Sequence, residues 1–531
     1  MDELHKSCRI EYRPGSLVAD LIHAMAAIRP HAPALFDGDR RVDYSDLAEL
    51  VRRFADKAIE LGLGAGDRVA VFLEKRIETV VAMFGAAHAG CAFVPVNPLL
   101  RPHQVAHILA DSGARLLVTS GPRAAGLGAA LAARWPGGRT LLVDDGLGPG
   151  APWLGPAGGG RAPHRRIASD MAAIFYTSGS TGLPKGVVLS HQNIVVGARS
   201  VAGYLGNAPE DRLLAALPLS FDAGFSQLTT AFTAGASVAL LNYVMPADVF
   251  RALDAHRITG LTAVPPLYAQ LAGDWPAGCG AALRYFANTG GAMPGEVLRR
   301  LRAALPGAKP YLMYGLTEAF RSTYLPPEEV DRRPDSIGKA IPDVEIMVVR
   351  PDGGACAPGE VGELVHRGPL VSLGYWNAPD KTAERFRPAP GLPEGLCLPE
   401  TAVWSGDMVR RDEEGFLYFV GRRDQMIKTS GNRVSPTEVE EVAFASGAVE
   451  QAVALGAPHP VLGQGIVLLV VPRGAALDRQ ALERHCQREL PSYMRPHLVI
   501  DRPSLPLNAN GKIDRVMLAE EVRDAFAGAA R

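Results

Sequence analysis

Short apolar runs alternate with longer amphipathic segments along the first part of the chain. Residues 68–73 (RVAVFL) and 92–96 (AFVPV) are continuous apolar runs of strand length, and residues 77–89 between them have the length of a helix. The runs at 115–119 and 140–143 repeat the pattern. This alternation continues through roughly the first 330 residues and predicts an α/β fold, in which helices cover both faces of a parallel sheet.

The pattern changes in the rest of the chain. Short segments rich in Val and Glu are separated by turn sequences at 351–354 (PDGG), 358–360 (PGE) and 412–415 (DEEG). Frequent turns between short strands predict antiparallel β-structure or a small barrel. From about residue 425 to the C-terminus, the sequence predicts a compact α+β unit.

Composition and charge exclude several classes of protein. The 531 residues are 47% hydrophobic and 21% charged, and 55 Lys and Arg against 56 Asp and Glu give a net charge of −1. A balanced charge provides no field that favours nucleic acid or an anionic membrane. The six cysteines are scattered without a CxxC pair, so we expect reduced thiols. No signal-peptide core and no apolar run of membrane-spanning length is visible, so we expect a cytoplasmic protein.

A run rich in glycine and hydroxyl residues carries the strongest chemical signal. Residues 176–186 (YTSGSTGLPKG) follow an apolar segment at 171–175. Glycines allow backbone N–H groups to point at an anion, hydroxyls add donors, and Lys185 adds a positive charge. The run is not a Walker A loop, because two residues separate Gly182 from the lysine. It predicts a loop that binds the phosphates of a nucleoside triphosphate. His191, just beyond it, is either structural or part of the same site.

Further blocks extend this signal over the chain. They are 288–292 (NTGGA), 314–318 (YGLTE), 362–364 (GEL), 374–375 (GY), 405–407 (SGD), 421–424 (GRRD), 430–433 (SGNR) and 511–512 (GK). In this order, and with residues 176–186, they resemble the adenylate-forming (AMP-binding) superfamily of acyl-CoA synthetases, adenylation domains and firefly-type luciferases. The resemblance covers residues 43–515, practically the whole chain.

The resemblance implies two hinged domains. An AMP-binding N-terminal domain, residues 1–420, would contain two doubly wound sheet subdomains and a small β-barrel-like subdomain at about 330–420. A hinge at 421–424 would join it to a mobile α+β C-terminal domain, residues 425–531, which carries a catalytic lysine.

The resemblance also implies ATP and Mg²⁺ as cofactors of a two-step ligase. A carboxylate attacks the α-phosphorus of ATP to give acyl-AMP and pyrophosphate, and a thiol then displaces AMP. Lys185 would stabilise charge on the phosphates. Thr317 would bind the α-phosphate, and Glu318 would hold Mg²⁺, which prefers oxygen ligands.

The nucleotide site follows from the same blocks. The ATP-binding residues that the resemblance implies are Thr177, Ser178, Gly179, Ser180, Thr181, Gly182, Gly290, Gly291, Ala292, Tyr314, Gly315, Asp407 and Arg422. Tyr314 would stack on adenine. Asp407 would accept hydrogen bonds from both ribose hydroxyls, and Arg422 would contact the same sugar.

Two groups of residues would serve the two half-reactions in turn. Lys512 resembles the catalytic lysine of the family, which bridges the attacking carboxylate and the leaving pyrophosphate. Asp424 occupies the hinge position. Rotation about it would withdraw Lys512 and bring in the thiol-acceptor side, where Ser430, Gly431 and Arg433 lie.

The block at 217–225 (LPLSFDAGF) concerns the substrate. Fatty-acid and acetate ligases have an aromatic–His pair near this point, whereas Phe221 and Asp222 resemble the amino-acid-activating members, whose Asp pairs with the substrate ammonium. Asp222 could instead cap a helix. Arg321 could pair with a second substrate carboxylate, with an acidic neighbour, or extend to solvent. The pocket residues implied are Asp222, Ala223, Ser226, Thr289, Met313 and Arg321, with Ala263, Ala287 and Ser322 beside them. Asp222 and Arg321 together suit an acidic amino acid.

The acceptor is a pantetheine thiol, of CoA or of a separate carrier protein. Residues 428–440 resemble acyl-CoA ligases more than peptide-synthetase domains, and no pantetheine attachment region follows Lys512 in this sequence. This mixed signature resembles the AMP-forming acyl-CoA ligases found with exosortase systems. The alternatives are an acyl-CoA synthetase for a non-amino acid, a luciferase-like oxygenase, and a non-catalytic relative. The oxygenase would need a bulky pocket, and the non-catalytic relative would lack the lysine, the acidic residue or the hinge.

Overall fold

The computed structural model describes residues 15–148, 150–177, 184–393, 395–423, 425–429, 432–459, 462–508 and 512–527. Within them, a six-stranded sheet has the strand order β6-β5-β3-β4-β7-β8. Its strands are β3 (Arg68–Phe72), β4 (Ala92–Pro95), β5 (Ala114–Thr119), β6 (Arg139–Leu142), β7 (Met171–Thr177) and β8 (Lys185–Ser190). All pairs are parallel except β7–β8, where Thr177 faces Lys185. The two ends of the predicted phosphate loop are therefore held side by side.

A second sheet forms the other half of the large domain. In sheet order its main strands are β16 (Glu345–Val349), β17 (Val361–Arg367), β19 (Thr401–Arg411), β20 (Leu417–Arg422), β15 (Ser336–Ala340), β14 (Thr323–Leu325), β13 (Lys309–Tyr314), β12 (Tyr285–Asn288), β11 (Gly260–Ala263), β9 (Arg212–Ala215), β10 (Ser237–Leu240), β1 (Pro33–Asp37) and β2 (Arg40–Asp43). The short β18 (Phe386–Pro388) pairs with β19. The parallel part ends at β13, and β14, β15 and β20 continue it in antiparallel pairing. The predicted barrel-like subdomain is thus an antiparallel extension of this sheet.

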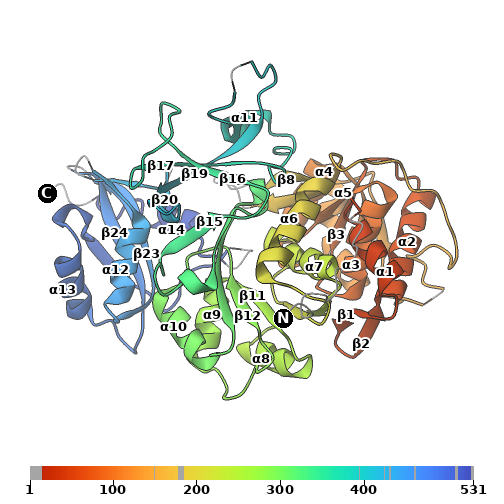
Figure 1. Ribbon diagram of the computed structural model, residues 1–531, viewed down its shortest axis with the longest axis horizontal. Helices are drawn as coiled ribbons and strands as arrows, with labels where there is room; N and C mark the ends of the chain where they lie inside the picture. The colour runs from red at the N-terminus through yellow and green to blue at the C-terminus, as the bar shows by residue number, and fades with distance from the viewer. Residues whose placement is uncertain are drawn as a thin grey trace, which may run out of the picture.

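Helices fill the space between the two sheets and cover their outer faces (Figure 1). The helices of the large domain are α1 (Asp20–Ile28), α2 (Tyr44–Glu60), α3 (Ile77–Ala89), α4 (Pro102–Ser112), α5 (Gly121–Arg134), α6 (His191–Leu205), α7 (Asp222–Ala234), α8 (Pro246–Ala255), α9 (Pro265–Gly273), α10 (Gly295–Ala304), α11 (Pro379–Arg385), and the 3₁₀ turns η1 (Thr317–Ala319) and η2 (Pro327–Glu329). The central core joins α3, α6 and α7 with the inward faces of both sheets, whereas α4 and α5 cover one outer face and α8, α9 and α10 the other.

Aromatic packing fixes α7, the helix that begins at Asp222. The Phe225 ring lies 5.0 Å from that of Phe93 on β4 and 5.7 Å from that of Phe175 on β7, measured between centroids. Phe84 on α3 packs against both Phe225 and Phe232. Buried aromatic rings contribute large apolar areas and have a defined packing geometry. Phe225 therefore anchors the first turn of α7 on the six-stranded sheet.

The C-terminal part forms a separate sheet with helices on both faces (Figure 1, blue). Its elements are β21 (Ile427–Thr429), β22 (Asn432–Val434), α12 (Pro436–Ala445), β23 (Val449–His459), β24 (Gly463–Pro472), α13 (Arg479–Glu489), η3 (Ser492–Met494), β25 (Leu498–Asp501) and α14 (Arg515–Glu521). The α/β class and the smaller C-terminal domain predicted from the sequence are confirmed. β20 ends at Arg422 and β21 begins at Ile427. The first two residues of the predicted hinge at 421–424 therefore belong to β20, and the hinge and the domain boundaries stay a prediction.

No helix in the described part of the chain is long and apolar enough to cross a membrane.

Candidate active site

Lys512 of the C-terminal domain lies against the large domain. Its Nζ is 5.4 Å from the centroid of the Phe221 ring, and a Cβ built on Gly290 would come within 3.0 Å of its Cε. Burial lowers the pKa of Lys512, while the negative charges of Asp222 and Glu318 oppose that shift. The predicted catalytic lysine and the predicted substrate and metal residues therefore meet at one place.

Two hydrogen bonds between Asn508 and Lys512 hold this lysine in position. Asn508 Oδ1 accepts a hydrogen bond from the Lys512 backbone N–H at 3.1 Å, and the Asn508 N–H donates to the Lys512 carbonyl at 2.7 Å. Arg515 follows and makes two hydrogen bonds of 2.7 Å to the buried carboxylate of Glu440 on α12. Both bonds come from Nη2, and charge-assisted hydrogen bonds of this kind are stronger than neutral ones. The pair ties the lysine segment to the core of the C-terminal domain.

Lys185, Glu318 and Tyr375 form a second cluster. Lys185 Nζ lies 3.4 Å from Glu318 Oε1 and donates to the Tyr375 hydroxyl at 2.8 Å, and the Tyr375 hydroxyl donates to the same Glu318 oxygen. Burial raises the pKa of Glu318, but Lys185 and Tyr375 lower it by more, so the net shift is downward. Burial lowers the pKa of Lys185. Glu318 is thus held as a carboxylate, the form that binds a divalent cation.

Asp407, Tyr314 and Arg422 form a third cluster. The Tyr314 hydroxyl donates to Asp407 Oδ2, and Arg422 Nη1 lies 2.9 Å from Asp407 Oδ1. Asp407 on β19 and Arg422 on β20 are direct partners in the antiparallel register. Burial raises the pKa of Asp407, and Arg422 opposes the shift. A buried carboxylate beside an aromatic face suits a ribose next to a base, which is the role that the resemblance implies.

Asp222 and Arg321 face each other. Arg321 Nη1 lies 3.8 Å from Asp222 Oδ2, and the two side chains are only 5% and 4% exposed. Asp222 also accepts the Ala223 N–H at 2.8 Å, and Arg321 donates to the Phe320 carbonyl at 3.0 Å. Burial raises the pKa of Asp222, while the charges of Arg321 and Lys512 oppose the shift. Of the alternatives left open for Arg321, the structure shows pairing with an acidic neighbour.

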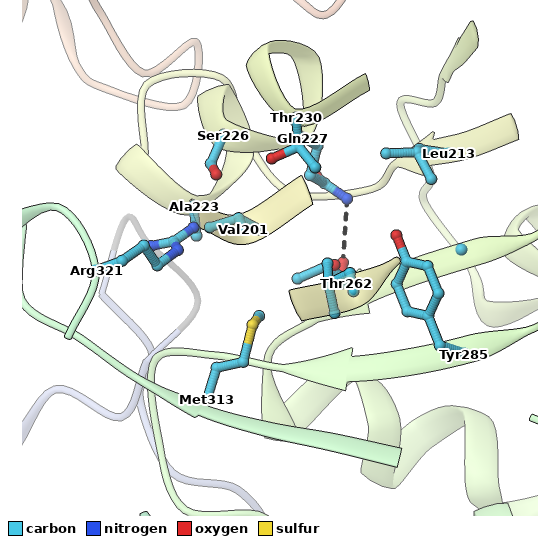
Figure 2. Close-up of a pocket in the computed structure, with 12 residues that line it drawn as sticks. Val201, Leu213, Ala223, Ser226, Gln227, Thr230, Thr262, Tyr285, Met313 and Arg321 are labelled. Carbon is cyan, nitrogen blue, oxygen red and sulfur yellow. Dashed lines mark hydrogen bonds between the residues drawn. The ribbon is translucent and has the colours of Figure 1, made fainter. Parts of the chain in front are cut away.

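A narrow cavity that Arg321 helps to line lies between α6 and α7 and the large sheet (Figure 2). Its lining residues are Val201, Leu205, Leu213, Ala223, Ser226, Gln227, Thr230, Gly260, Thr262, Tyr285, Met313 and Arg321. The cavity volume, taken as the space that the centre of a water molecule can occupy, is about 10 Å³. This is roughly enough for one water molecule. Of the predicted pocket residues, Ala223, Ser226, Met313 and Arg321 line this cavity, whereas Asp222 and Thr289 do not.

Other predicted residues lie at the carboxyl ends of the strands. Gly290, Gly291 and Ala292 follow β12, and the Gly291 carbonyl accepts a hydrogen bond of 2.8 Å from Asn288. Thr317 begins η1, one residue before Glu318. Gly315 packs closely, since a Cβ there would lie 3.2 Å from the Arg321 Cα. The carboxyl edge of an open parallel sheet is the usual place for a ligand.

Several predicted residues cannot be compared with the structure. Ser178, Gly179, Ser180, Thr181, Gly182, Asp424, Ser430 and Gly431 lie outside the described residues, and Arg433 is described only as backbone in β22. Their roles stay predictions.

The sequence motifs assigned no role to Tyr375 and did not decide the role of His191. Tyr375 was part of a sequence block without an assigned role, and its contacts to Lys185 and Glu318 depend on folding. His191 accepts a hydrogen bond from the Val18 N–H through Nδ1 at 3.1 Å and is 1% exposed. It ties the segment before α1 to α6 and has a structural role.

The polar side chains of this region suit a nucleotide with bound Mg²⁺. Thr177, the last residue of β7, has a buried hydroxyl without a hydrogen-bond partner among the described residues. Asp407 Oδ1 forms an ion pair with Arg422 but accepts no hydrogen bond from the part of the chain that the structure describes. The described residues contain no cluster of three or more His, Cys, Asp or Glu for a metal. Mg²⁺ is usually bound by one or two carboxylates together with phosphate oxygens and water, so Glu318 with ATP would suffice.

Comparison with known proteins agrees with this geometry. Residues 22–376 match the AMP-binding enzyme family, and residues 438–512 match the AMP-binding enzyme C-terminal domain. The chain is 33% identical over 515 residues to an L-proline–[L-prolyl-carrier protein] ligase of Pseudomonas fluorescens, covering 94% of this chain and 98% of that protein. It is 31% identical over 526 residues to a sulfoacetate–CoA ligase of Cupriavidus necator, covering 96% and 99%.

Two solved structures extend the comparison. ATP-bound MatB of Rhodopseudomonas palustris is 27% identical, with a TM-score of 0.85 over 96% of this chain and 99% of that one. The o-succinylbenzoate coenzyme A synthetase MenE of Bacillus subtilis, in complex with ATP and a magnesium ion, is 27% identical, with a TM-score of 0.81 over 96% and 99%.

Proposed function

The chain belongs to the AMP-binding enzyme family and is an ATP-dependent, AMP-forming ligase, and we propose that its substrate is a small amino acid with an acidic side chain. The observation that carries this proposal is the buried Arg321 guanidinium at the cavity, opposite Asp222. Arg321 Nε has no hydrogen-bond partner among the described residues. A buried donor without a partner costs about 1–3 kcal/mol, which a substrate anion would recover.

The charges of the site match those of such a substrate. Its α-ammonium would pair with Asp222 and its α-carboxylate with Lys512, leaving Arg321 for the side-chain anion. Positive and negative charges would then balance in a region of low exposure, where unpaired charge is costly. Both similar ligases support parts of this assignment: proline carries an amine, and sulfoacetate carries a second anionic group.

The residues would act in sequence. Lys185 and Lys512 would neutralise charge as the substrate carboxylate oxygen bonds to the α-phosphorus of ATP and pyrophosphate leaves. Mg²⁺ at Glu318 would add neutralisation of the phosphates when bound. In the second half-reaction a thiolate would attack the acyl carbon and AMP would leave. The acceptor would be a pantetheine thiol, since the similar ligases use a carrier protein or CoA.

A second candidate substrate is a small diacid without an amine. It is favoured by one observation: Asp222 already has Arg321 as a partner and needs no ammonium to balance its charge. In this case the acyl-CoA synthetase alternative would apply, with CoA as the acceptor.

Substrate-dependent ATP–pyrophosphate exchange separates the two candidates. The panel would contain acidic and neutral amino acids, diacids without an amine, aryl acids and fatty acids. We expect exchange with an acidic amino acid and its loss in Asp222→Ala. Exchange only with acids that lack an amine, unaffected by their amino analogues, would refute the amino-acid proposal and support the diacid.

A further inference from the structure

Arg385 lies beside the cluster around Lys185 that is proposed to serve the phosphate groups. It is the last residue of α11, and Thr382 of this helix accepts a hydrogen bond of 3.0 Å from the Tyr375 N–H. The ring centroid of Phe386, the next residue, lies 5.5 Å from that of Tyr375. The Tyr375 hydroxyl in turn accepts a hydrogen bond of 2.8 Å from Lys185. Helix α11 therefore packs on the residue that contacts Lys185.

The Arg385 guanidinium extends from there to the backbone that precedes Asp407. Its Nη1 donates a hydrogen bond of 3.4 Å to the Trp404 carbonyl on β19. A Cβ on Gly406 would overlap with this Nη1 and lie 3.0 Å from the Arg385 Cζ. This close approach requires a glycine, and Gly406 also has a φ of 72°, which favours glycine. Arg385 thus lies between the Lys185 cluster and the Asp407 cluster.

The neighbouring arginines have carboxylate partners, whereas Arg385 has none among the described residues. Arg387 Nη2 lies 3.6 Å from Glu363 Oε2, and Arg423 Nη1 lies 3.3 Å from the same oxygen. Arg385 is partly buried, and its hydrogen bond to the Trp404 carbonyl involves a neutral acceptor. A charged group that loses water without gaining an opposite charge is costly. The arrangement therefore indicates an anionic ligand at Arg385.

The charge of Arg385 acts on both clusters. Burial is the main cause that lowers the pKa of Lys185, and the positive charge of Arg385 lowers it further. Burial raises the pKa of Tyr375 and of Asp407, and Arg385 is among the groups that oppose both shifts. An anion located between the two clusters would therefore be attracted by Lys185 and Arg385 together.

We propose that Arg385 is a further phosphate-binding residue, which contacts the part of ATP that leaves as pyrophosphate. Its helix packs on the Lys185 cluster, so we assign it to the β- and γ-phosphate groups and not to the ribose. Pyrophosphate gains negative charge as it leaves, and a guanidinium beside it stabilises that charge. Arginine can also donate two parallel hydrogen bonds to phosphate oxygens. This inference rests on the placement of ATP in the proposed function, but not on the identity of the acid.

Nucleotide binding to Arg385→Gln tests the proposal, because glutamine can still donate to the Trp404 carbonyl but carries no charge. Dissociation constants for ATP, pyrophosphate and AMP would be measured by isothermal titration calorimetry, with Mg²⁺ and without an acid. We expect the constants for ATP and pyrophosphate to rise about ten- to a hundredfold and that for AMP to stay at its wild-type value. Arg385→Lys should recover part of the affinity, since it restores the charge but not the paired donors.

Arg387→Gln is the matched control. Arg387 lies two residues further along the chain, but Glu363 balances its charge, so all three dissociation constants should stay at their wild-type values. The same losses in both glutamine variants, equal weakening of ATP and AMP, or unchanged binding of all three ligands would overturn the role of Arg385. Exchange kinetics give a second readout. The KM for pyrophosphate should rise in Arg385→Gln, whereas thioester formation from supplied acyl-AMP should keep its wild-type rate.

Failure of the proposed function has a different signature. If the wild-type protein does not bind ATP, the placement of the nucleotide falls, and the role of Arg385 falls with it. If the wild-type protein binds ATP but exchanges only with acids that lack an amine, the amino-acid proposal falls alone. The binding test of Arg385 then keeps its meaning, because it is carried out without an acid.

Discussion

Asp222 and Arg321 are buried partners at 3.8 Å, although neither makes a direct hydrogen bond to the other. Arg321 lines the cavity, and its Nε has no hydrogen-bond partner among the described residues. At this separation, a ligand can contact each of the two side chains more closely than they contact each other. The same two side chains are therefore expected to affect both the free energy of unfolding and the substrate specificity.

Arg321→Gln should affect stability and specificity together. Removing one member of a buried pair leaves the other charge uncompensated, so the free energy of unfolding should fall by about 3–5 kcal/mol. The KM for an acidic amino acid should rise far more than that for a neutral one, as measured by pyrophosphate exchange. If both KM values rise alike, Arg321 has only a structural role.

The double variant Asp222→Asn/Arg321→Gln provides the control for that experiment. Because both charges are absent, it should unfold at a higher urea concentration than Arg321→Gln alone. It should also fail to activate any amino acid. Additive losses of stability would mean that the two side chains do not interact.

Lys512→Ala should separate the two half-reactions. Lys512 contacts Phe221 and lies near Gly290, so it can stabilise charge during adenylation. We expect exchange to slow by about 10²–10³-fold, whereas thioester formation from supplied acyl-AMP should remain close to wild type. Equal loss of both half-reactions would contradict the domain alternation that the sequence predicts.

Tyr375→Phe should weaken the response to Mg²⁺. The tyrosine hydroxyl donates to Glu318 and accepts from Lys185, so it orients the carboxylate proposed to bind the metal. Loss of such an outer contact typically lowers metal affinity by about 10–100-fold. The Mg²⁺ concentration for half-maximal exchange should rise accordingly. Tyr44→Phe, whose hydroxyl donates to the Ala236 carbonyl in the core, should leave the Mg²⁺ dependence unchanged.

Local elements were predictable from sequence because their signals are local. The helix at 77–89 was predicted with the bounds that the structure shows, since it ends at Gly90, whose backbone is left-handed. Strands such as Arg68–Phe72 agree within one or two residues. For the region after about residue 330, the sequence predicted antiparallel β-structure or a small barrel, and the structure has antiparallel pairing. The sequence could not decide between the two, because the pairing joins segments far apart in the chain.

The site was predictable as a set of residue types and only partly as an arrangement. The order of the sequence blocks indicated Lys512, Glu318 and Asp407 together, and the structure brings these residues to one region. The contact of Tyr375 with Lys185 could not be read from the sequence, because side-chain pairs across subdomains depend on tertiary packing. The same holds for the pairing of Asp222 with Arg321.

Buried neutral histidines should make the protein sensitive to acid. Burial lowers the pKa of His191 to about 4, from the ordinary value of 6.5. Below pH 6.5 the unfolded chain therefore binds a proton that the folded chain excludes, so the free energy of unfolding falls as the pH falls. The loss is complete below about pH 4 and amounts to about 3 kcal/mol for this residue.

His191→Asn should remove that contribution. The asparagine Oδ1 can accept the Val18 N–H in place of the imidazole Nδ1, and it does not titrate. Urea unfolding between pH 7 and 4 should give a flatter dependence for this variant than for the wild type. Replacement of the exposed His103 by Asn serves as the control and should leave the wild-type curve unchanged. If His191→Asn shows the full wild-type slope, the acid sensitivity arises from other groups, among them His88 and His366, whose pKa values burial lowers to about 3.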